Sequence, residues 1–246
     1  MRKTALLPAL LLAGGLFLTP AMAPAYWMSS DTGMSLSIGA GNYLLSQAVL
    51  DSSSPAKTQE SRRQRTTPPP AANTSNTASI NTRFTPTRRG RGLDEMAARY
   101  PAAERAEARR KMQQLYDHWP QMAQQLGVPA NDMGSALAAY LVGSWMAYRD
   151  VDYPDAQFKL ATEQMRHVLA EFPDFAGMSN ADRQYSHEQL VTLGILVALT
   201  RHELKQSPNR QVQAQLRQLA GRNLRQFLNV DPDRVHFRAD GLMEIR

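Results

Sequence analysis

Two stretches of the chain, residues 136–148 (ALAAYLVGSWMAY) and 190–199 (LVTLGILVAL), are apolar on nearly every helical face. A helix that is apolar all round is either a central helix of a folded core or a membrane span. Neither stretch reaches the roughly 20 residues that a spanning helix needs, and Asp150 and His202 close them off. We therefore expect two buried helices around which the rest of the fold is arranged.

Three further helices are expected, because apolar residues recur at steps of three and four. They lie between Pro101 and Gly127, between Pro154 and Pro173, and after Pro208. Pro120 lacks a backbone N–H group and predicts a kink or break of the first of them near Trp119. Asn131 or Asp132 suits the N-cap position of the first central helix, and the cap-like run Ser179-Asn180-Ala181-Asp182 opens the second.

The last residues, RVHFRADGLMEIR (234–246), change from helical periodicity to alternation. Asp240-Gly241 between the two alternating runs is typical of a hairpin turn. The five helix starts, near 102, 132, 154, 180 and 208, have no fixed period, which excludes a regular repeat array. The expected fold class is mainly α, an irregular bundle of about five helices with a small C-terminal β-hairpin.

The first 25 residues have the composition of a secretory signal peptide. Arg2 and Lys3 precede an apolar run over residues 5–18, and a tail of mostly small residues, AMAPA, follows at positions 21–25. The apolar run is short for a signal anchor, so we predict cleavage and a periplasmic or secreted protein. The A-x-A rule fits Ala21/Ala23 and Ala23/Ala25, and because the first would put Pro24 just after the cut, we place cleavage before Tyr26. No Cys follows the run, which excludes a lipoprotein anchor, and a chain without Cys must be stabilised by burial alone.

Two segments separate the signal peptide from the predicted helical domain at 93–246. Residues 26–50 are apolar, with a strand-like first half and a helix-like second half, and are expected to dock on the domain or on a partner. Residues 51–92 are rich in Ser, Thr, Pro, Asn and Arg and nearly lack large apolar side chains. Such a segment cannot bury enough surface to offset the loss of backbone entropy, so we predict a disordered basic linker.

The net charge of +6 is concentrated at the front of the chain. The linker carries 8 Lys and Arg against 2 Asp and Glu, whereas residues 93–246 carry 18 against 19. A nucleic-acid-binding domain normally carries the basic charge on its own folded face, so we expect no nucleic-acid partner. The linker is either a plain spacer or a weak contact to anionic lipid or polysaccharide through its arginines. Six of its seven arginines would make this contact: Arg62, Arg63, Arg65, Arg88, Arg89 and Arg91.

No metal site can be read from the spacing of the ligand-type residues. His187 and His202 are each followed by Glu but lack the second His that a zinc-protease helix needs four positions later. The run that begins at Asp150 resembles a calcium loop, but it has no Gly at the turn and Ala161 stands where the bidentate Glu belongs. We expect no metal and no cofactor.

No catalytic residue can be selected either. The chain has no Cys and no nucleophile elbow, and Ser144 lies in an apolar helix without a neighbouring base. Helical lytic transglycosylases use a Glu-Ser pair at a helix end, whereas the only Glu-Ser here, Glu60-Ser61, lies in the linker. Four other carboxylates cannot be ranked by spacing as a glycosidase pair: Glu163, Glu171, Asp174 and Glu188.

One short run, SWMAYRDVDYPDAQFK (144–159), combines charge and aromatic residues where the first central helix ends. Its candidate binding residues are Tyr148, Arg149, Asp150, Asp152 and Tyr153. The other interpretation is a structural joint between two helices. In that case Asp152, or alternatively Tyr153, caps a helix with Pro154 at its first position. Arg149 would then pair with Asp150, Asp152 or a carboxylate elsewhere.

The segments MAYRDVDYPDAQFK (146–159) and FLNVDPDRVHF (227–237) carry a resemblance to a known family. Together with the export signal, the low-complexity linker and the helix order, they resemble an uncharacterised family of exported domains of unknown function in Gram-negative bacteria. The resemblance covers roughly residues 93–238. It implies no activity, ligand or catalytic residue.

The leading functional hypothesis is an exported, non-catalytic binding or scaffold domain of the bacterial cell envelope. Its partner would be an envelope protein or glycan, with no transmembrane segment after signal cleavage. The alternative hypothesis is an envelope hydrolase that acts on cell-wall or surface glycan, with a site near Arg149 assembled from scattered carboxylates.

Overall fold

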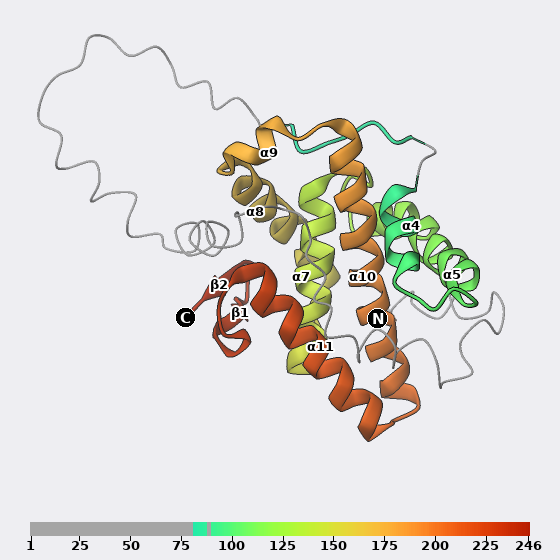
Figure 1. Ribbon diagram of the computed structural model, residues 1–246. Helices are drawn as coiled ribbons and strands as arrows, with labels where there is room; N and C mark the ends of the chain where they lie inside the picture. Colours follow the sequence, from blue (N-terminus) through green and yellow to red (C-terminus); the bar gives the residue numbers. More distant parts are fainter. Residues whose placement is uncertain (1–80, 88–89) are drawn as a thin grey trace, which may run out of the picture.

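The computed structural model of the chain describes residues 81–87 and 90–246 (Figure 1). The predicted signal peptide, the apolar segment 26–50 and linker residues 51–80 and 88–89 lie outside the described residues. The described part is mainly helical and ends in a two-stranded antiparallel sheet. The predicted fold class is therefore confirmed.

The two central helices are α7 (Met133–Arg149) and α10 (Asn180–Gln206), which pack along each other in the middle of the fold (Figure 1). Their backbones approach closely where Gly143 faces Gly194. A Cβ atom on Gly143 would lie 2.8 Å from the Gly194 carbonyl oxygen, and one on Gly194 would lie 2.7 Å from that of Ala139. The two apolar stretches thus form the core, as their composition predicted.

The remaining helices cover this central pair from several sides (Figure 1). On the α10 side lie α4 (Arg91–Ala98), α5 (Arg105–Asp117) and α6 (Trp119–Gln125). On the α7 side lie α8 (Phe158–Ala170) and the short α9 (Pro173–Gly177). Helix α11 (Arg210–Leu228) packs against both central helices. The short helices α4 and α9 add to the five that periodicity predicted.

Most helix ends follow the signals in the sequence. The break that Pro120 predicts lies at His118, which separates α5 from α6. Gly127 has a positive φ of 69°, which suits a residue without Cβ. Asp132 and Ser179 are the N-caps of α7 and α10, and each side chain accepts from a backbone N–H three residues later.

The entry to α8 differs from the prediction. A 3-10 turn, η2 (Asp155–Gln157), follows Pro154, and α8 begins only at Phe158. Neither Asp152 nor Tyr153 caps a helix, and Pro154 precedes the turn instead of opening the helix. The cap prediction was wrong because Asp152 receives hydrogen bonds from two cationic side chains of α10, which satisfy its carboxylate instead.

The C-terminal hairpin pairs β1 (Val235–Phe237) with β2 (Met243–Ile245). Gly241 in its turn has a φ of 86°, a conformation that favours glycine. The side-chain amide of Gln164, on α8, accepts from the Met243 N–H at 2.8 Å and donates to the Met243 carbonyl at 2.7 Å. The edge of the hairpin is therefore tied to the helical core.

The folded unit starts before Leu93. Residues 81–87, which the sequence analysis placed in the linker, run over the N-terminal ends of α7 and α10 (Figure 1). Phe84 and Thr82 of this segment are buried. The described part of the linker therefore contacts the domain, and α4 begins at Arg91.

Candidate functional site

The end of α7, defined here as the joint (residues 148–153), carries the five residues that the sequence analysis singled out. Two of them turn toward Asp233. The Tyr148 hydroxyl donates to the Asp233 carboxylate at 2.9 Å. Arg149 donates to the Asp233 carbonyl oxygen at 2.6 Å, and its guanidinium lies 3.6 Å from the carboxylate. Arg149 thus pairs with a carboxylate elsewhere in the chain, one of the alternatives that the sequence left open.

Two other joint residues turn toward α10. Asp150 ends α7 in the left-handed conformation, with φ at 54°, and its carboxylate accepts from Arg201 at 3.2 Å. Asp152 accepts from Arg201 at 2.8 Å and from Lys205 at 2.7 Å. Hydrogen bonds from Lys205 and Arg201 lower the pKa of Asp152. Arg201 itself is only 5% exposed, so its charge is held by this pair of carboxylates.

Tyr153 points away from the other four. Its hydroxyl is directed to the carbonyl oxygen of Gly241, at 2.6 Å, and its ring packs edge-on against Phe237 at 5.0 Å. Burial raises its pKa. The structure therefore does not bring the five residues to one place, because they reach three different later elements of the fold.

A second polar region lies at the other end of the central helices. We define the strap as residues 81–87, and the strap groove as the surface that it occupies on α10 and at the start of α7. Along the strap, Thr82 and Phe84 are buried, whereas Asn81, Arg83 and Thr85 are exposed. This alternation is that of an extended segment with one face on a protein surface.

Backbone hydrogen bonds fix one edge of the strap. The Phe84 N–H donates to the Asn131 carbonyl at 3.2 Å, and the Met133 N–H donates to the Thr82 carbonyl at 3.0 Å. These bonds form an antiparallel bridge between Arg83 and Asp132. The strap thus pairs, as a short strand does, with the chain that enters α7.

Two side-chain amides of α10 hold the main chain of the strap. Asn180 accepts from the Thr85 N–H at 2.6 Å and donates to the Thr85 carbonyl at 2.8 Å. Gln184 does the same for Thr87, at 2.8 and 2.9 Å. Four residues of helix rise about 6 Å, and two residues of an extended chain span about 6.6 Å, so the two amides match alternate residues of the strap.

Arg183, between the two amides, adds a third contact to the main chain. It donates to the carbonyl oxygens of Asn81 at 2.8 Å and of Arg83 at 3.2 Å. The same guanidinium lies 4.8 Å from the centre of the Phe175 ring. Three side chains in the first turns of α10 therefore hold the strap mainly by the N–H and carbonyl groups of the strap's own main chain.

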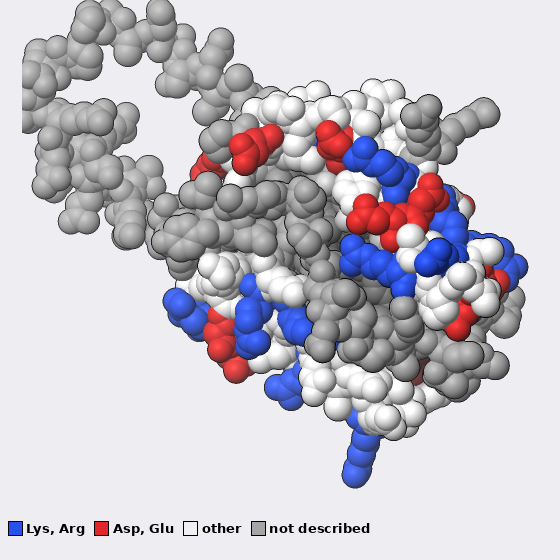
Figure 2. Space-filling model, viewed as in Figure 1, with Lys and Arg blue, Asp and Glu red and all other residues white. Residues whose placement is uncertain are grey.

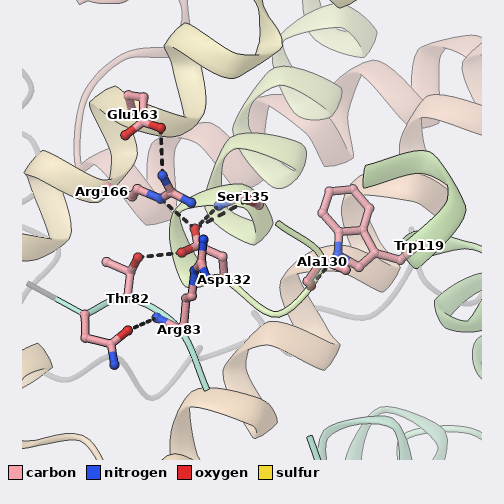
Figure 3. A network of polar contacts seen from close by, with 9 residues as sticks. Thr82, Arg83, Trp119, Ala130, Asp132, Ser135, Glu163 and Arg166 are labelled. Carbon is pink, nitrogen blue, oxygen red and sulfur yellow. Dashed lines mark hydrogen bonds and ion pairs between the residues drawn. The ribbon is translucent and has the colours of Figure 1, made fainter. Parts of the chain in front are cut away.

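The buried strap residue Thr82 contacts an ionic network at the start of α7 (Figure 3). Its hydroxyl donates at 2.6 Å to Asp132, a carboxylate that is only 1% exposed. The other oxygen of Asp132 accepts from the Ser135 N–H at 3.0 Å and from Arg166 at 3.1 Å, and Arg166 also pairs with Glu163 at 2.7 Å. Asp132 therefore caps α7, holds α8 through Arg166 and binds the strap through Thr82.

The other buried strap residue, Phe84, lies in an aromatic pocket around His187. The centre of its ring is 4.8 Å from that of His187, and the rings of Tyr116 and Trp119 surround the same imidazole. Tyr116 Oη and His187 Nδ1 are 3.0 Å apart, while Nε2 has no hydrogen-bond partner. Burial lowers the pKa of His187 to about 4, against weaker opposing effects of the Ala130 carbonyl and Asp132. The imidazole is therefore neutral near pH 7.

Glu188 connects the strap groove to α4. Its carboxylate accepts from the Gly92 N–H and from the Gln184 amide, both at 2.8 Å. Burial raises its pKa, against the effect of these hydrogen bonds. One carboxylate oxygen of Glu188 thus accepts from a free N–H group in the first turn of α4, and the other orients the Gln184 amide that holds the strap.

The sequence did not reveal that Asp132 and His187 lie in one site with the strap, and it gave no role to Asn180 and Gln184 as side-chain ligands of the strap. Phe84 is the sole aromatic residue in 51–92, and it is the one signal in the sequence that the end of the linker is bound. Asn180 and Gln184 lie four residues apart on a helix, but amides at that spacing are common on solvated faces. Within residues 81–87 and 90–246, no group of three or more His, Cys, Asp or Glu side chains is placed to hold a metal ion.

The comparisons with known proteins give a family and no activity. The chain belongs to the family of unknown function DUF6683, which matches residues 1–244. No curated protein and no solved structure matches the chain significantly. In the part of the chain that the structure describes, no helix has the length and apolar character needed to cross a bilayer.

Proposed function

We propose that this member of DUF6683 is an exported, non-catalytic binding or scaffold domain of the bacterial cell envelope. The composition of residues 1–25 supports export. The observation that carries the binding function is the pair of amides, Asn180 and Gln184, which hold an extended segment by its N–H and carbonyl groups.

A surface of this kind suits the binding of polypeptide. Every N–H and C=O group that leaves water must find a partner, and a preformed row of amides on a rigid helix supplies both donors and acceptors. Main-chain hydrogen bonds then provide affinity, and pockets for alternate side chains provide selectivity. The strap groove offers main-chain hydrogen bonds and two contacts to alternate side chains, because Thr82 donates to Asp132 and the Phe84 ring packs against His187.

The contacts of the joint give its charged residues a structural role within the domain. Tyr148 and Arg149 are held by Asp233, and Arg201 holds Asp150 and Asp152. These contacts link the end of α7 to α10 and to the chain after α11. They give no support to the alternative hypothesis of a hydrolase site around Arg149, because its guanidinium already binds other groups of the fold.

Site-specific cross-linking of the full-length protein in a Gram-negative host tests this proposal. A photo-reactive amino acid is introduced at Ala181, an exposed residue next to Asn180, and at exposed Gln218 of α11 as the matched control. We expect the processed protein in the periplasmic or extracellular fraction, with cross-linked adducts from position 181 and not from 218. Retention of the uncleaved precursor in the cytoplasm would contradict export. Equal or absent adducts at the two positions would contradict binding through this groove.

A further inference from the structure

We infer that the strap groove also accepts the strap of a second copy of this chain, so that two copies join by exchanging residues 81–87. This inference rests on the proposed binding function and names its partner. It starts from the segment that occupies the groove, which belongs to the chain itself.

The contacts of the strap come from a compact part of the domain. They are made by the first two turns of α10, the N-terminal end of α7 with the residues before it, and the aromatic pocket around His187. An identical segment from another copy would make the same contacts, so exchange replaces each hydrogen bond by an equal one. Exchange of an identical element between protomers is a low-cost route to dimers.

The contacts of two side chains select the sequence that can occupy the groove. Asp132 accepts a hydroxyl at position 82, and the pocket around His187 takes an aromatic ring at position 84. A shift of one residue would place Arg83 or Thr85 in the aromatic pocket. The pattern Thr-x-Phe occurs once in the 246 residues, at 82–84, so a second copy carries one matching segment.

Competition within each chain determines when exchange is observed. The strap of the same chain is present at an effective concentration on the order of millimolar, so it occupies the groove in dilute solution. We therefore expect the wild-type chain to be mainly monomeric at micromolar concentration. Exchange becomes visible when one copy has a defective strap and the other a defective groove.

A pair of complementary full-length variants provides the test. The acceptor carries Phe84→Ala, which weakens its own strap and leaves the groove intact. The donor carries Asn180→Ala and Gln184→Ala, which remove both amide contacts, weaken the hold of its groove on its own strap and leave the strap sequence intact. Mixed at about 100 µM, below the millimolar effective concentration in cis, the two should form a 1:1 complex by light scattering, while each alone stays monomeric.

A matched control replaces the acceptor by Arg83→Ala, whose substituted side chain is exposed, so that its strap remains competent. This variant should form no complex with the donor. A fluorescent peptide of residues 80–87 should bind the acceptor at least tenfold more tightly than it binds wild type, and the same peptide with Ala at position 84 should not bind.

Circular dichroism of each variant checks that it folds. Should Phe84→Ala fail to fold, Thr85→Pro is a second acceptor, because it removes the N–H that donates to Asn180 and keeps the aromatic ring. Persistence of monomers in the mixture of folded donor and acceptor overturns the exchange. Cross-links from position 181 to another protein would in that case leave the proposed binding function standing.

Discussion

The joint and the strap groove are both rich in polar side chains, but they use them differently. In the joint, Arg201 and Lys205 pair with carboxylates that remain largely in water, Asp150 at 58% and Asp152 at 72% exposure. In the strap groove, Asp132 and Gln184 are buried and contact backbone groups. The charged residues of the joint, which stand out in the sequence, therefore connect helices. The amides of Asn180 and Gln184, which do not stand out, bind an extended segment of chain.

The same contrast extends to the surface around these regions. Blue and red side chains alternate over α4 and α5 in Figure 2, where pairs such as Arg109 with Asp94 bridge the two helices. Exposed pairs of this kind contribute little to stability, about 0–1 kcal/mol each. We therefore expect buried polar residues such as Asp132 to contribute more to the free energy of unfolding than exposed ion pairs. Substitutions in the strap groove and in the joint measure this difference.

The largest effect is expected for Asp132→Ala in the strap groove. The substitution removes the N-cap of α7, the acceptor for Thr82 and one partner of Arg166, and should lower the free energy of unfolding by about 3 kcal/mol. Urea unfolding measures the loss. Asp132→Asn is the control, because it keeps a capping acceptor without the charge and should lose less than Asp132→Ala. A loss below about 1 kcal/mol for Asp132→Ala would remove the energetic distinction between groove and joint.

The pH dependence of stability should also originate in the strap groove. The pKa of His187 falls from 6.5 to about 4 on folding, so the unfolded chain binds more protons between these values. The contribution of His187 to the free energy of unfolding is therefore complete above pH 6.5. It decreases as the pH falls toward 4, by about 3 kcal/mol in total. The raised pKa of Glu188 acts in the opposite direction in the acid range.

Urea unfolding of wild type and His187→Gln at several pH values separates these two contributions. The variant should lose the part of the slope that lies between pH 4 and 6.5. Parallel curves for the two proteins would mean that the imidazole is not buried in its neutral form.

A smaller effect is expected at the one buried residue of the joint. Tyr153→Phe removes a hydroxyl that lies 2.6 Å from the Gly241 carbonyl and should cost about 1 kcal/mol. Thermal unfolding measures it, with Tyr148→Phe as the matched control, because Tyr148 contacts an exposed carboxylate and should lose less. A larger loss at Tyr148 would reverse the ranking of the two tyrosines.

The smallest effect is expected at the exposed carboxylates. Asp152→Ala should change the free energy of unfolding by less than about 1 kcal/mol, since Arg201 keeps Asp150 as a partner. The double variant Asp150→Ala/Asp152→Ala leaves the buried guanidinium without a carboxylate and should lose more than the sum of the single variants. Additive losses in chemical unfolding would show that Arg201 does not depend on this pair.

The central helices and their ends could be predicted because the signals are local. Apolar residues on all faces, the break before Pro120 and the caps at Asp132 and Ser179 depend only on neighbours in the sequence. The cap predicted at Asp152 failed for the opposite reason. A carboxylate can accept from the next turn or from a distant cation, and here Arg201, 49 residues away, is the partner.

The sequence by itself determined a Cys-free, mainly helical chain with a core of two apolar helices and a C-terminal hairpin, since periodicity and turn chemistry act over a few residues. Only the tertiary structure decided which segment lies in the strap groove. Backbone groups are the same at every residue, so no composition reveals that Asn180 and Gln184 bind Thr85 and Thr87 across more than 90 residues. That pairing exists because the spacing of two helical amides matches alternate residues of an extended chain, a match that appears once the fold places them together.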